Sequence, residues 1–557
     1  MAVAAQKQQL PPASQSKLFT IFYYISLVSA SCAPSPIPIR IGNVTLSNSE
    51  TARGLDISVG TPAQPFAFLP QWPLNNTFVY GTSGFCSTGW TSAACVTFRG
   101  GQYDQLGSKT RGIASTNAYP ADASPYPQCN YVTDNFTLSS NITLGNFPIG
   151  IAQADWGTQG YFPQMALGLG SNSTVLNTLK STGQIASRSW SMFWGRTGAT
   201  ANTQLDGNFV FGGYDRAKVI GPNYTRSLST SKTACTTELL VTITDMILNF
   251  PNGTDASLFG GAQSSALAAC IVPTYPVLMT IPTNPYFDTF EFTTGESLPG
   301  RSLGLYYYGM LYGTGTGSTP YGGDLTIKLD SGLSVRVPND QLVVPDVSID
   351  PTSGALIANA STPELVLNAI QSVNANDLPQ LGRQFLTAAY LMVNQDANQF
   401  TLWEANPTAN EDLVAVDVNN GVVNSFCAAS AASSSTASAK PGVATSTGPA
   451  QNNSNGLSSG AIAGIAAGSI AVIAGIVGFL IFFLIKRRKV GSDSYATRFS
   501  FMKKQEDPGA SPPTHVLQYI DHYKAELESG PVPCGTRAQE KHEVDGRPTV
   551  SSPAELA

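Results

Sequence analysis

Short apolar runs alternate with polar positions along most of the chain, from about residue 34 to residue 427. In the stretch 325–337 (LTIKLDSGLSVRV), apolar residues recur at every second position, which is the period of a half-buried β-strand. Gly, Pro, Asn and Ser interrupt these runs at short intervals, as turns between strands require. Only the stretches 175–183 and 363–373 predict helices. The pattern therefore predicts an all-β globular part.

Two longer apolar segments lie outside this globular part. Residues 18–30 follow a lysine and end in small residues, which predicts a signal peptide over 1–33 with cleavage near Ala30 or Ala33. An uncleaved membrane anchor is the alternative interpretation of this segment. Residues 461–485 carry no charge and are long enough, as a helix, to cross a bilayer core of ~30 Å. We therefore expect one transmembrane helix there.

The residues that flank the expected span predict its orientation. A basic cluster, KRRK at 486–489, follows it directly, and such clusters mark the cytosolic side. We expect a single-pass protein of the plasma membrane or cell surface, with its N-terminal part extracellular. The Ala, Ser and Thr-rich stretch 428–459 predicts a disordered stalk, and 486–557 predicts a mostly disordered cytosolic tail. The alternative for the tail is a short helix that docks a cytosolic partner, since four apolar residues recur there at helical spacing: Val516, Ile520, Tyr523 and Leu527.

Glycosylation motifs agree with this topology. Every Asn-x-Ser/Thr motif precedes the expected span and none follows it, as expected if only the N-terminal side is extracellular. The nine candidate acceptors are Asn43, Asn75, Asn135, Asn141, Asn172, Asn223, Asn252, Asn359 and Asn452.

Composition excludes several classes of function. Only 12% of the residues are charged and the net charge is −6, which argues against a nucleic-acid partner. All three histidines (His515, His522 and His542) lie in the tail, so the extracellular part has none. Ser-His-Asp and Cys-His catalytic sites and His-ligated zinc are thereby excluded from that part, and we expect neither a metal nor a cofactor. Paired carboxylates remain the available chemistry for hydrolysis there.

The cysteines fit an oxidising compartment. Cys32 is expected to leave with the signal peptide or to lie beside it, and Cys534 is expected to be cytosolic. Of the remaining pairings, only Cys86 with Cys95, which would close a short loop, can be singled out from the sequence. The six disulfide candidates are Cys86, Cys95, Cys129, Cys235, Cys270 and Cys427.

Several segments of the globular part resemble, in the same order, segments of the pepsin-type aspartic proteases. The resemblance implies a bilobal pepsin-like aspartic protease fold with a central cleft, an N-terminal β lobe at 34–225 and a C-terminal β lobe at 226–427. The matching segments are LDISVGTPAQPFAFL (55–69), MALGLG (165–170), GQI, WSMF and GNFVFGGYD (within 183–215), CIVPTYPVLMTIP (270–282) and LGRQFLTAAYLMVNQDANQFTLWEA (381–405).

An internal repeat predicts two similar halves without reference to any family. An apolar strand running into Pro70 is followed by Gly168 in an apolar context, and one running into Pro273 is followed by Gly382 at a similar interval. Two halves with similar spacing imply two lobes related by an approximate two-fold axis, with a cleft between them.

The catalytic residues that the resemblance implies are missing. Family members use two Asp residues, one from each lobe, that share a proton and activate a water molecule. The matching positions hold Pro70 and Pro273, which have no titratable side chain and no backbone N–H. Neighbouring residues become candidates to line the cleft, either as a surface for a peptide or glycan ligand or as side chains that fill the cleft: Gln71, Trp72, Thr274 and Tyr275.

Other residues compete for roles near the cleft. Asp330-Ser331-Gly332 resembles the catalytic triplet but lies between two alternating strands, which predicts a hairpin turn. Asp56 is expected to face solvent, and Asp288 to lie on a surface turn or short helix. The family keeps a tyrosine over its cleft, and here both Tyr119 and Tyr126 are candidates.

These observations lead to one functional hypothesis and two alternatives. The leading hypothesis is a catalytically inactive, aspartic-protease-like cell-surface glycoprotein that binds or senses a ligand. The first alternative is a membrane-anchored aspartic endopeptidase acting on extracellular proteins at acidic pH. The second is a purely structural surface glycoprotein.

Overall fold

The structure is a computed structural model that describes residues 32–427 except 73, 87, 116–118, 120–128, 156–163, 199–202, 232–234, 261–265, 314–318 and 424. Residues 1–31 of the expected signal peptide and the expected stalk, span and tail, at 428–557, lie outside the described residues, as do Asn452, Cys534 and Tyr126. Among the helices of the described residues, none has both the length and the apolar character to cross a membrane.

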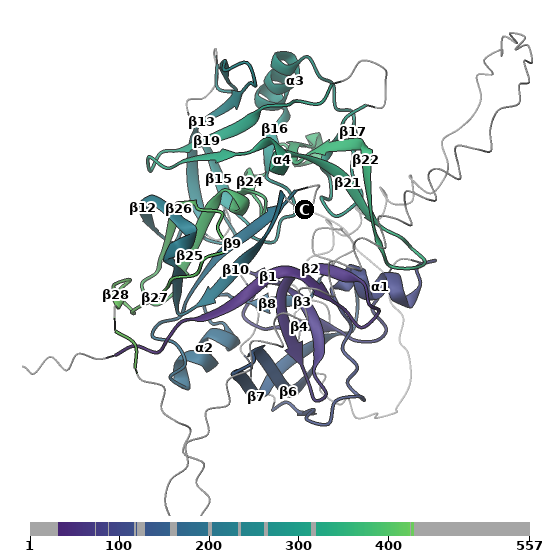
Figure 1. Ribbon diagram of the computed structural model, residues 1–557, viewed down its shortest axis with the longest axis vertical. Coiled ribbons are helices and arrows are strands. Elements are labelled where there is room, and N and C mark those ends of the chain that lie inside the picture. The colour runs from purple at the N-terminus through teal and green to yellow at the C-terminus, as the bar shows by residue number, and fades with distance from the viewer. Residues whose placement is uncertain are drawn as a thin grey trace, which may run out of the picture. The chain divides into compact units, whose positions relative to one another are not determined.

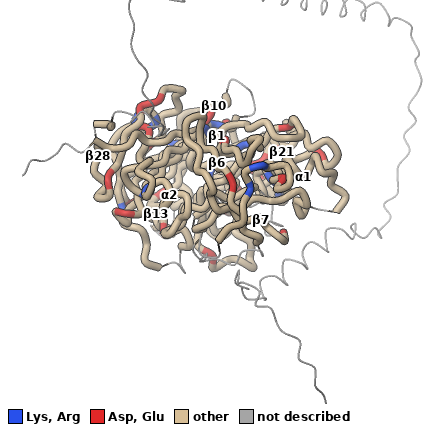
Figure 2. Tube along the Cα trace, turned by 90° about the horizontal axis from the view of Figure 1, so that it is seen from below, with Lys and Arg blue, Asp and Glu red and all other residues tan. Residues whose placement is uncertain are grey.

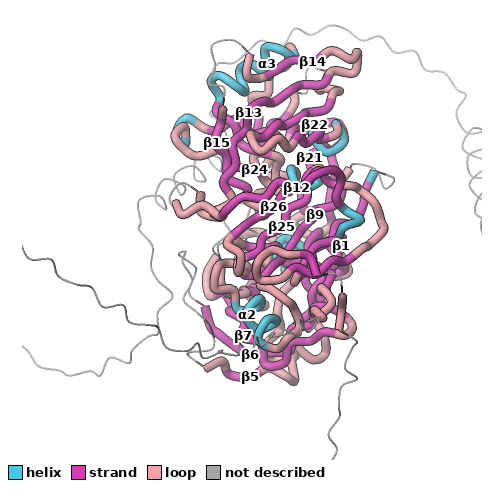
Figure 3. Tube along the Cα trace, turned by 90° about the vertical axis from the view of Figure 1, so that its left-hand side faces the viewer, coloured by secondary structure: helices cyan, strands magenta, loops and turns pink. Residues whose placement is uncertain are grey.

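Strands dominate the described residues, as the alternating pattern predicts (Figure 3). One long sheet runs in the order β12-β26-β25-β9-β10-β1-β2-β3-β8-β4-β7-β6-β5. Its strands are β1 (Ile37–Thr45), β2 (Thr51–Val59), β3 (Gln64–Gln71), β4 (Phe78–Tyr80), β5 (Gly112–Ile113), β6 (Cys129–Ser139), β7 (Ile142–Ala152), β8 (Ala166–Gly168), β9 (Ser189–Thr197), β10 (Gln204–Phe211), β12 (Val219–Ser227), β25 (Ala389–Asn394) and β26 (Gln399–Ala405).

The second half of the chain forms two further sheets. A small third sheet pairs one strand of the first half with two strands near the end of the described residues. One has the order β20-β19-β13-β15-β24-β16-β23 with β14 on β13, another is β17-β18-β22-β21, and the small one is β11-β27-β28. Their strands are β11 (Gly213–Asp215), β13 (Leu240–Asn249), β14 (Asp255–Ser257), β15 (Leu267–Ile271), β16 (Met279–Pro282), β17 (Gly300–Arg301), β18 (Met310–Leu311), β19 (Asp324–Leu329), β20 (Ser334–Val337), β21 (Val343–Ile349), β22 (Leu356–Leu365), β23 (Leu367–Ile370), β24 (Gln380–Leu381), β27 (Leu413–Val416) and β28 (Val422–Val423).

Figure 1 shows β1–β8 on one side of the described unit, β13–β24 on the other, and β9, β10, β25 and β26 between them. The strands β25 and β26 come late in the sequence, yet they pair with β9 and β12 from the first half. A boundary near residue 225 therefore separates the two outer groups of strands but does not divide this shared sheet.

The helices correct one expectation and confirm another. The α-helices are α1 (Ser92–Arg99), α2 (Thr174–Ser181), α3 (Asp288–Thr294) and α4 (Asn339–Leu342). The helix expected at 175–183 is confirmed by α2. The helix expected at 363–373 is wrong, because this stretch forms the end of β22 and then β23. Residues 365–370 are all buried, and a fully buried strand has the same continuous apolar run as a buried helix.

Strand pairing bears out the internal repeat. In the first half β8 runs parallel to β3 and antiparallel to β4, and β4 runs parallel to β7. In the second half β24 runs parallel to β15 and antiparallel to β16, and β16 runs parallel to β23. The same four-strand crossing therefore occurs twice, which makes the two halves structurally equivalent at this point.

The disulfides differ from expectation at two cysteines. Cys86–Cys95 is confirmed, and Cys235 pairs with Cys270. Cys32, which was expected to leave with or lie beside the signal peptide, pairs instead with Cys427, and Cys129 is in none of these three bridges. The Ala33 N–H also donates to the Ser425 carbonyl at 2.9 Å, so Cys32 and Ala33 belong to the folded unit and the expected segment boundary at residue 33 falls inside it.

Apolar side chains from both halves form one continuous core around the shared sheet, including Ile41, Phe68, Trp190, Met279 and Leu391. Charged residues are thinly spread over the described part, as Figure 2 shows. Several of them are paired, for example Arg40 with Asp206 at 2.7 Å and Arg188 with Asp396 at 2.7 Å.

Candidate functional site

The two crossings are where the resemblance to aspartic proteases implies catalytic carboxylates, and neither crossing contains one. The N-terminal crossing segment, 69–76, reads LPQWPLNN, and the C-terminal one, 271–278, reads IVPTYPVL. The absence of Asp and Glu from both segments holds whichever residue of each is taken as the catalytic position. The crossings therefore lack the groups that would bind and activate a water molecule.

The strand register shows that the two prolines are not equivalent. Pro70 pairs with Leu167, the residue before Gly168. In the other half Ile271 pairs with Leu381, the residue before Gly382. Counted from the two crossing glycines, Pro70 is therefore equivalent to Ile271, and Pro273 lies two residues further along the chain.

Three of the four residues expected to line the cleft are buried. Gln71 and Trp72 are each 3% exposed and Thr274 is 1% exposed. Trp72 packs against Trp190, with ring centroids 6.4 Å apart. Tyr275 is half-buried, and its hydroxyl accepts a hydrogen bond from the Asn368 side chain at 3.3 Å. None of the four lines the pocket between the halves that is described below.

The other candidate residues lie in the expected kinds of structure. Asp330 is in the turn between β19 and β20 and pairs with Arg226 at 2.6 Å. Asp56 on β2 has an exposed side chain, and Asp288 begins α3. Tyr119 stacks on Tyr131 of β6, with ring centroids 3.4 Å apart.

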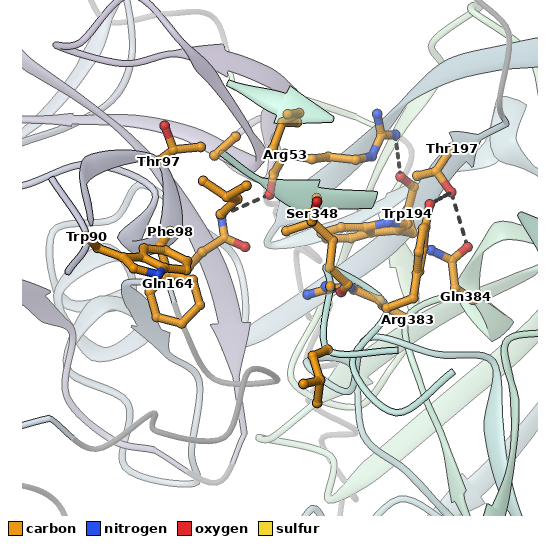
Figure 4. A pocket seen from close by; sticks show the side chains of 17 residues that line it. Arg53, Trp90, Thr97, Phe98, Gln164, Trp194, Thr197, Ser348, Arg383 and Gln384 are labelled. Carbon is orange, nitrogen blue, oxygen red and sulfur yellow. Dashed lines mark hydrogen bonds between the residues drawn. The ribbon is translucent and has the colours of Figure 1, made fainter. Parts of the chain in front are cut away.

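A pocket of ≈ 170 Å³ lies between the two halves of the described unit (Figure 4). Strand β2 and helix α1 contribute residues from the first half, β9 of the shared sheet contributes Trp194 and Thr197, and the hairpin β21–β22 contributes residues from the second. The described residues that line it include no Asp or Glu: Ala52, Arg53, Trp90, Thr97, Phe98, Gln164, Trp194, Thr197, Leu303, Gly304, Leu305, Tyr306, Ser348, Ile349, Leu356, Arg383 and Gln384.

The hairpin β21–β22 closes one side of this pocket by docking on α1. The turn of the hairpin accepts two hydrogen bonds from Thr91, the N-cap residue of α1: from its N–H to the Pro351 carbonyl at 2.9 Å, and from its hydroxyl to the Thr352 carbonyl at 2.6 Å. Ser348, Ile349 and Leu356 at the same end of the hairpin line the pocket. The hairpin thus links the second half of the chain to the first across the pocket.

Two arginines give the pocket its charge. Arg53 donates to the backbone carbonyls of Trp194 and Leu205 at 2.8 and 3.0 Å, and the nearest backbone acceptor of Arg383 is the Leu305 carbonyl at 3.4 Å. Removal from water is the main cause that lowers the pKa of each guanidinium to about 10, so both remain cations at neutral pH. Among the described residues, neither has a carboxylate within ion-pair distance.

Trp194 lies between these two cations. The guanidinium carbon of Arg383 is 5.2 Å from the centre of the Trp194 ring, and that of Arg53 is 5.7 Å from it. Figure 4 shows the indole between the two arginine side chains. The ring offers cation–π stabilisation to both, which offsets part of the cost of taking them out of water.

A buried carboxyl group lies close to this pocket, in the second half of the chain. Glu364 on β22 is 0% exposed, and burial is the main cause that raises its pKa to about 9. The charge of Asp346, on the adjacent strand β21, raises this pKa further. The Ser302 hydroxyl, which donates to Asp346 at 2.7 Å, has the opposite effect. Glu364 is therefore neutral at pH 7.

Comparisons with known proteins give two similarities. Residues 405–490 match the family model described as "Giardia variant-specific surface protein". The structure of the aspartic proteinase from Irpex lacteus is similar with a TM-score of 0.44 and 15% sequence identity, over 67% of this chain and 100% of that one. No curated protein matches the chain. The family model covers less than half of the chain and the structural similarity is distant, so neither establishes the family of this protein.

Sequence reasoning missed the arginines and the buried glutamate. Arg53 follows the short turn after β1, and Arg383 follows the second crossing glycine, so nothing in the local pattern brings them together. Glu364 lies in the stretch that was assigned to a helix, and this concealed its burial within a sheet. Across the described residues, no three metal-ligating side chains gather in one place.

Proposed function

We propose that this chain is a non-catalytic cell-surface protein whose two-lobed extracellular part binds a ligand in the pocket between its halves. The observation that carries the proposal is the absence of any carboxylate from the crossing segments 69–76 and 271–278. Hydrolysis of a peptide by this type of fold needs two such groups, one from each half.

The location rests on the sequence outside the described residues. The uncharged stretch 461–485 and the basic cluster after it favour a single span with the N-terminal part outside. The match of 405–490 to a family of surface proteins agrees with that location. In this proposal the stretch 428–459 is a stalk and the tail is available to a cytosolic partner.

The pocket supports binding. It combines aromatic and aliphatic side chains with a few polar groups, which is typical of sites for small ligands. A peptide side chain or a small organic molecule is the kind of occupant that ≈ 170 Å³ accommodates, since an apolar cavity of ~150 Å³ holds benzene.

A second candidate function is an acid endopeptidase with a different carboxyl pair. Glu364 and Asp346 lie on adjacent strands, and a neutral carboxyl beside an ionised one is the arrangement that acid proteases use. Two facts weigh against it. Both groups come from the same hairpin rather than from the two halves, and Glu364 is completely buried.

One experiment separates these functions. The purified full chain is incubated with a denatured protein substrate at pH 3 to 5, with and without a pepstatin-like inhibitor, beside the variant Glu364→Gln. We expect no cleavage above background in any arm. Inhibitor-sensitive cleavage would refute the proposal, and its loss in Glu364→Gln would assign it to the Glu364–Asp346 pair.

A further inference from the structure

The guanidinium of Arg383 is buried without a complete set of acceptors. Arg383 is 8% exposed, and its Nη1 has no hydrogen-bond partner among the described residues. Its Nη2 reaches the Leu305 carbonyl only at 3.4 Å. A buried cation that lacks partners is costly, because it gives up the water that would otherwise solvate it.

Arg53 adds a second positive charge, with a smaller deficit of hydrogen-bond partners. Its Nε is buried and has no hydrogen-bond partner among the described residues. Burial is the main cause that lowers the pKa of Arg383, and the nearby charge of Arg53 lowers it further. Two like charges beside one pocket raise the electrostatic potential there and favour an anion.

Among the residues that the structure describes, no group supplies that anion. The described residues lining the pocket carry no Asp or Glu. Asp206, the acidic residue that acts most strongly on Arg53, is already paired with Arg40 at 2.7 Å. The Glu364 carboxyl is neutral at pH 7 and does not line the pocket.

We propose that the pocket binds a carboxylate attached to an apolar body, with the carboxylate on Arg383 and the apolar body against Trp194 and its aliphatic neighbours, while the charge of Arg53 adds to the positive potential. This inference rests on the proposed binding function and specifies the chemistry of the ligand. Arginine suits the role because its planar fork of N–H donors matches the two oxygens of a carboxylate.

The size and lining of the pocket limit the apolar body. Trp90, Phe98 and Trp194 line the pocket together with leucines from the second half. A space of ≈ 170 Å³ accommodates a group of about the size of a phenyl ring. Either a free aromatic acid or the C-terminal residue of a peptide presents an apolar group and a carboxylate in this way.

The test measures binding to the purified full chain by isothermal titration calorimetry. The probes are 3-phenylpropionate and its neutral amide, followed by a short peptide ending in Phe with either a free or an amidated C-terminus. We expect each acid to bind at least tenfold more tightly than its amide. Preference for the peptide acid over 3-phenylpropionate would identify a peptide terminus as the source, and the reverse would identify a small organic acid.

Variants assign the binding to Arg383. Arg383→Gln should weaken binding of the acids at least tenfold and leave the amides unchanged. Arg383→Lys, which keeps the charge but not the fork, should give an intermediate loss. The matched control is Arg336→Gln, an exposed arginine that pairs with Asp324 and does not line the pocket, which should bind like the unchanged protein.

Thermal unfolding distinguishes a ligand-binding role from a structural one. Without ligand, Arg383→Gln should be at least as stable as the unchanged chain, because it removes an uncompensated buried charge. If this variant does not fold, Arg383→Lys provides the binding comparison between acid and amide. Equal binding of acid and amide, equal binding by the arginine variants, or no binding of any probe would overturn the inference. Proteolytic activity in the separate cleavage assay would refute the proposed function without affecting these comparisons.

Discussion

Gly168 and Gly382 occupy equivalent places in the two halves of the molecule. Gly168 is the last residue of β8 and Gly382 follows β24, and each of these short strands crosses between two others. A Cβ atom on Gly168 would collide with the carbonyl oxygen of Asn76, and one on Gly382 would collide with that of Val277. Both crossings therefore depend on a residue without a side chain, which lets two backbone segments pass at close range.

Alanine at either crossing glycine should destabilise the fold. Gly168→Ala and Gly382→Ala should each lower the free energy of unfolding by about 1–3 kcal/mol or more, because backbone atoms must move to admit the methyl group. Gly313→Ala is the control, since a Cβ there meets no atom within 4 Å. Chemical denaturation of the three variants measures the difference. If Gly313→Ala lowers the free energy of unfolding as much as Gly168→Ala or Gly382→Ala does, the crossing geometry is contradicted.

Stability should fall as the pH rises from 5 to 8, in part because of Glu364. Its pKa in the folded chain is raised to about 9 from an ordinary value of 4.5, so the folded state holds a proton that the unfolded state releases. This contribution is complete below pH 4.5 and is lost progressively up to pH 9. The slope for one such proton is about 1.4 kcal/mol per pH unit.

Glu364→Gln should remove that slope, since the amide remains neutral at every pH. Unfolding by urea at pH 5, 6, 7 and 8 measures the free energy for the unchanged chain and the variant. Glu404→Gln, at an exposed position on β26, is the matched control and should keep the slope. A slope that persists in Glu364→Gln would show that another group is responsible.

The bridge between Cys32 and Cys427 should stabilise the folded unit. It closes a loop with a sequence separation of 395 residues, and loss of a native disulfide costs about 2–5 kcal/mol. The free energy of unfolding should fall by similar amounts in Cys32→Ser, Cys427→Ser and the double variant, because all three remove the same bond. Cys129→Ser, outside the three bridges, should change stability less. A double variant that loses the sum of the two single losses would argue against the pairing.

If the expected signal peptide is cleaved, the same bridge limits where the mature chain can begin. Cleavage after Ala33 would remove Cys32, whereas cleavage near Ala30 retains it. N-terminal sequencing of the secreted or surface-expressed protein should therefore begin at or before Cys32. A mature chain that begins after Cys32 would exclude this disulfide.

Glycan attachment should spare Asn75. Its side chain is only 7% exposed, and its Oδ1 accepts a hydrogen bond from the Asn172 N–H at 3.0 Å. By contrast Asn43, Asn141, Asn172, Asn223, Asn252 and Asn359 are exposed, and Asn135 is half-buried.

An endoglycosidase mobility shift on single variants tests this difference. Asn223→Gln or Asn252→Gln should reduce the shift by one glycan, and Asn75→Gln should leave it unchanged. No shift in the unchanged chain would contradict the extracellular placement of this region. A reduced shift in Asn75→Gln would show that this asparagine is modified before it is buried.

Much of the architecture could be predicted from the sequence because local patterns of apolar and polar residues determine the strands. Alternation of apolar and polar residues predicted the strands, and an apolar strand followed at a similar interval by a glycine in each half predicted two similar halves. The helix prediction for 363–373 was wrong for a physical reason. When both sides of a strand are buried, its period of two disappears, and no local signal separates it from a helix.

Some conclusions follow from the sequence alone because they do not depend on where any residue lies. Segments 69–76 and 271–278 have no carboxylate and residues 34–455 have no histidine, whatever the fold. The tertiary structure decided the rest: the partner of Cys32, the burial of Glu364, and the position of Arg53 and Arg383 on either side of Trp194. These relationships join residues far apart in the chain, and both burial and charge depend on neighbours that only folding brings together.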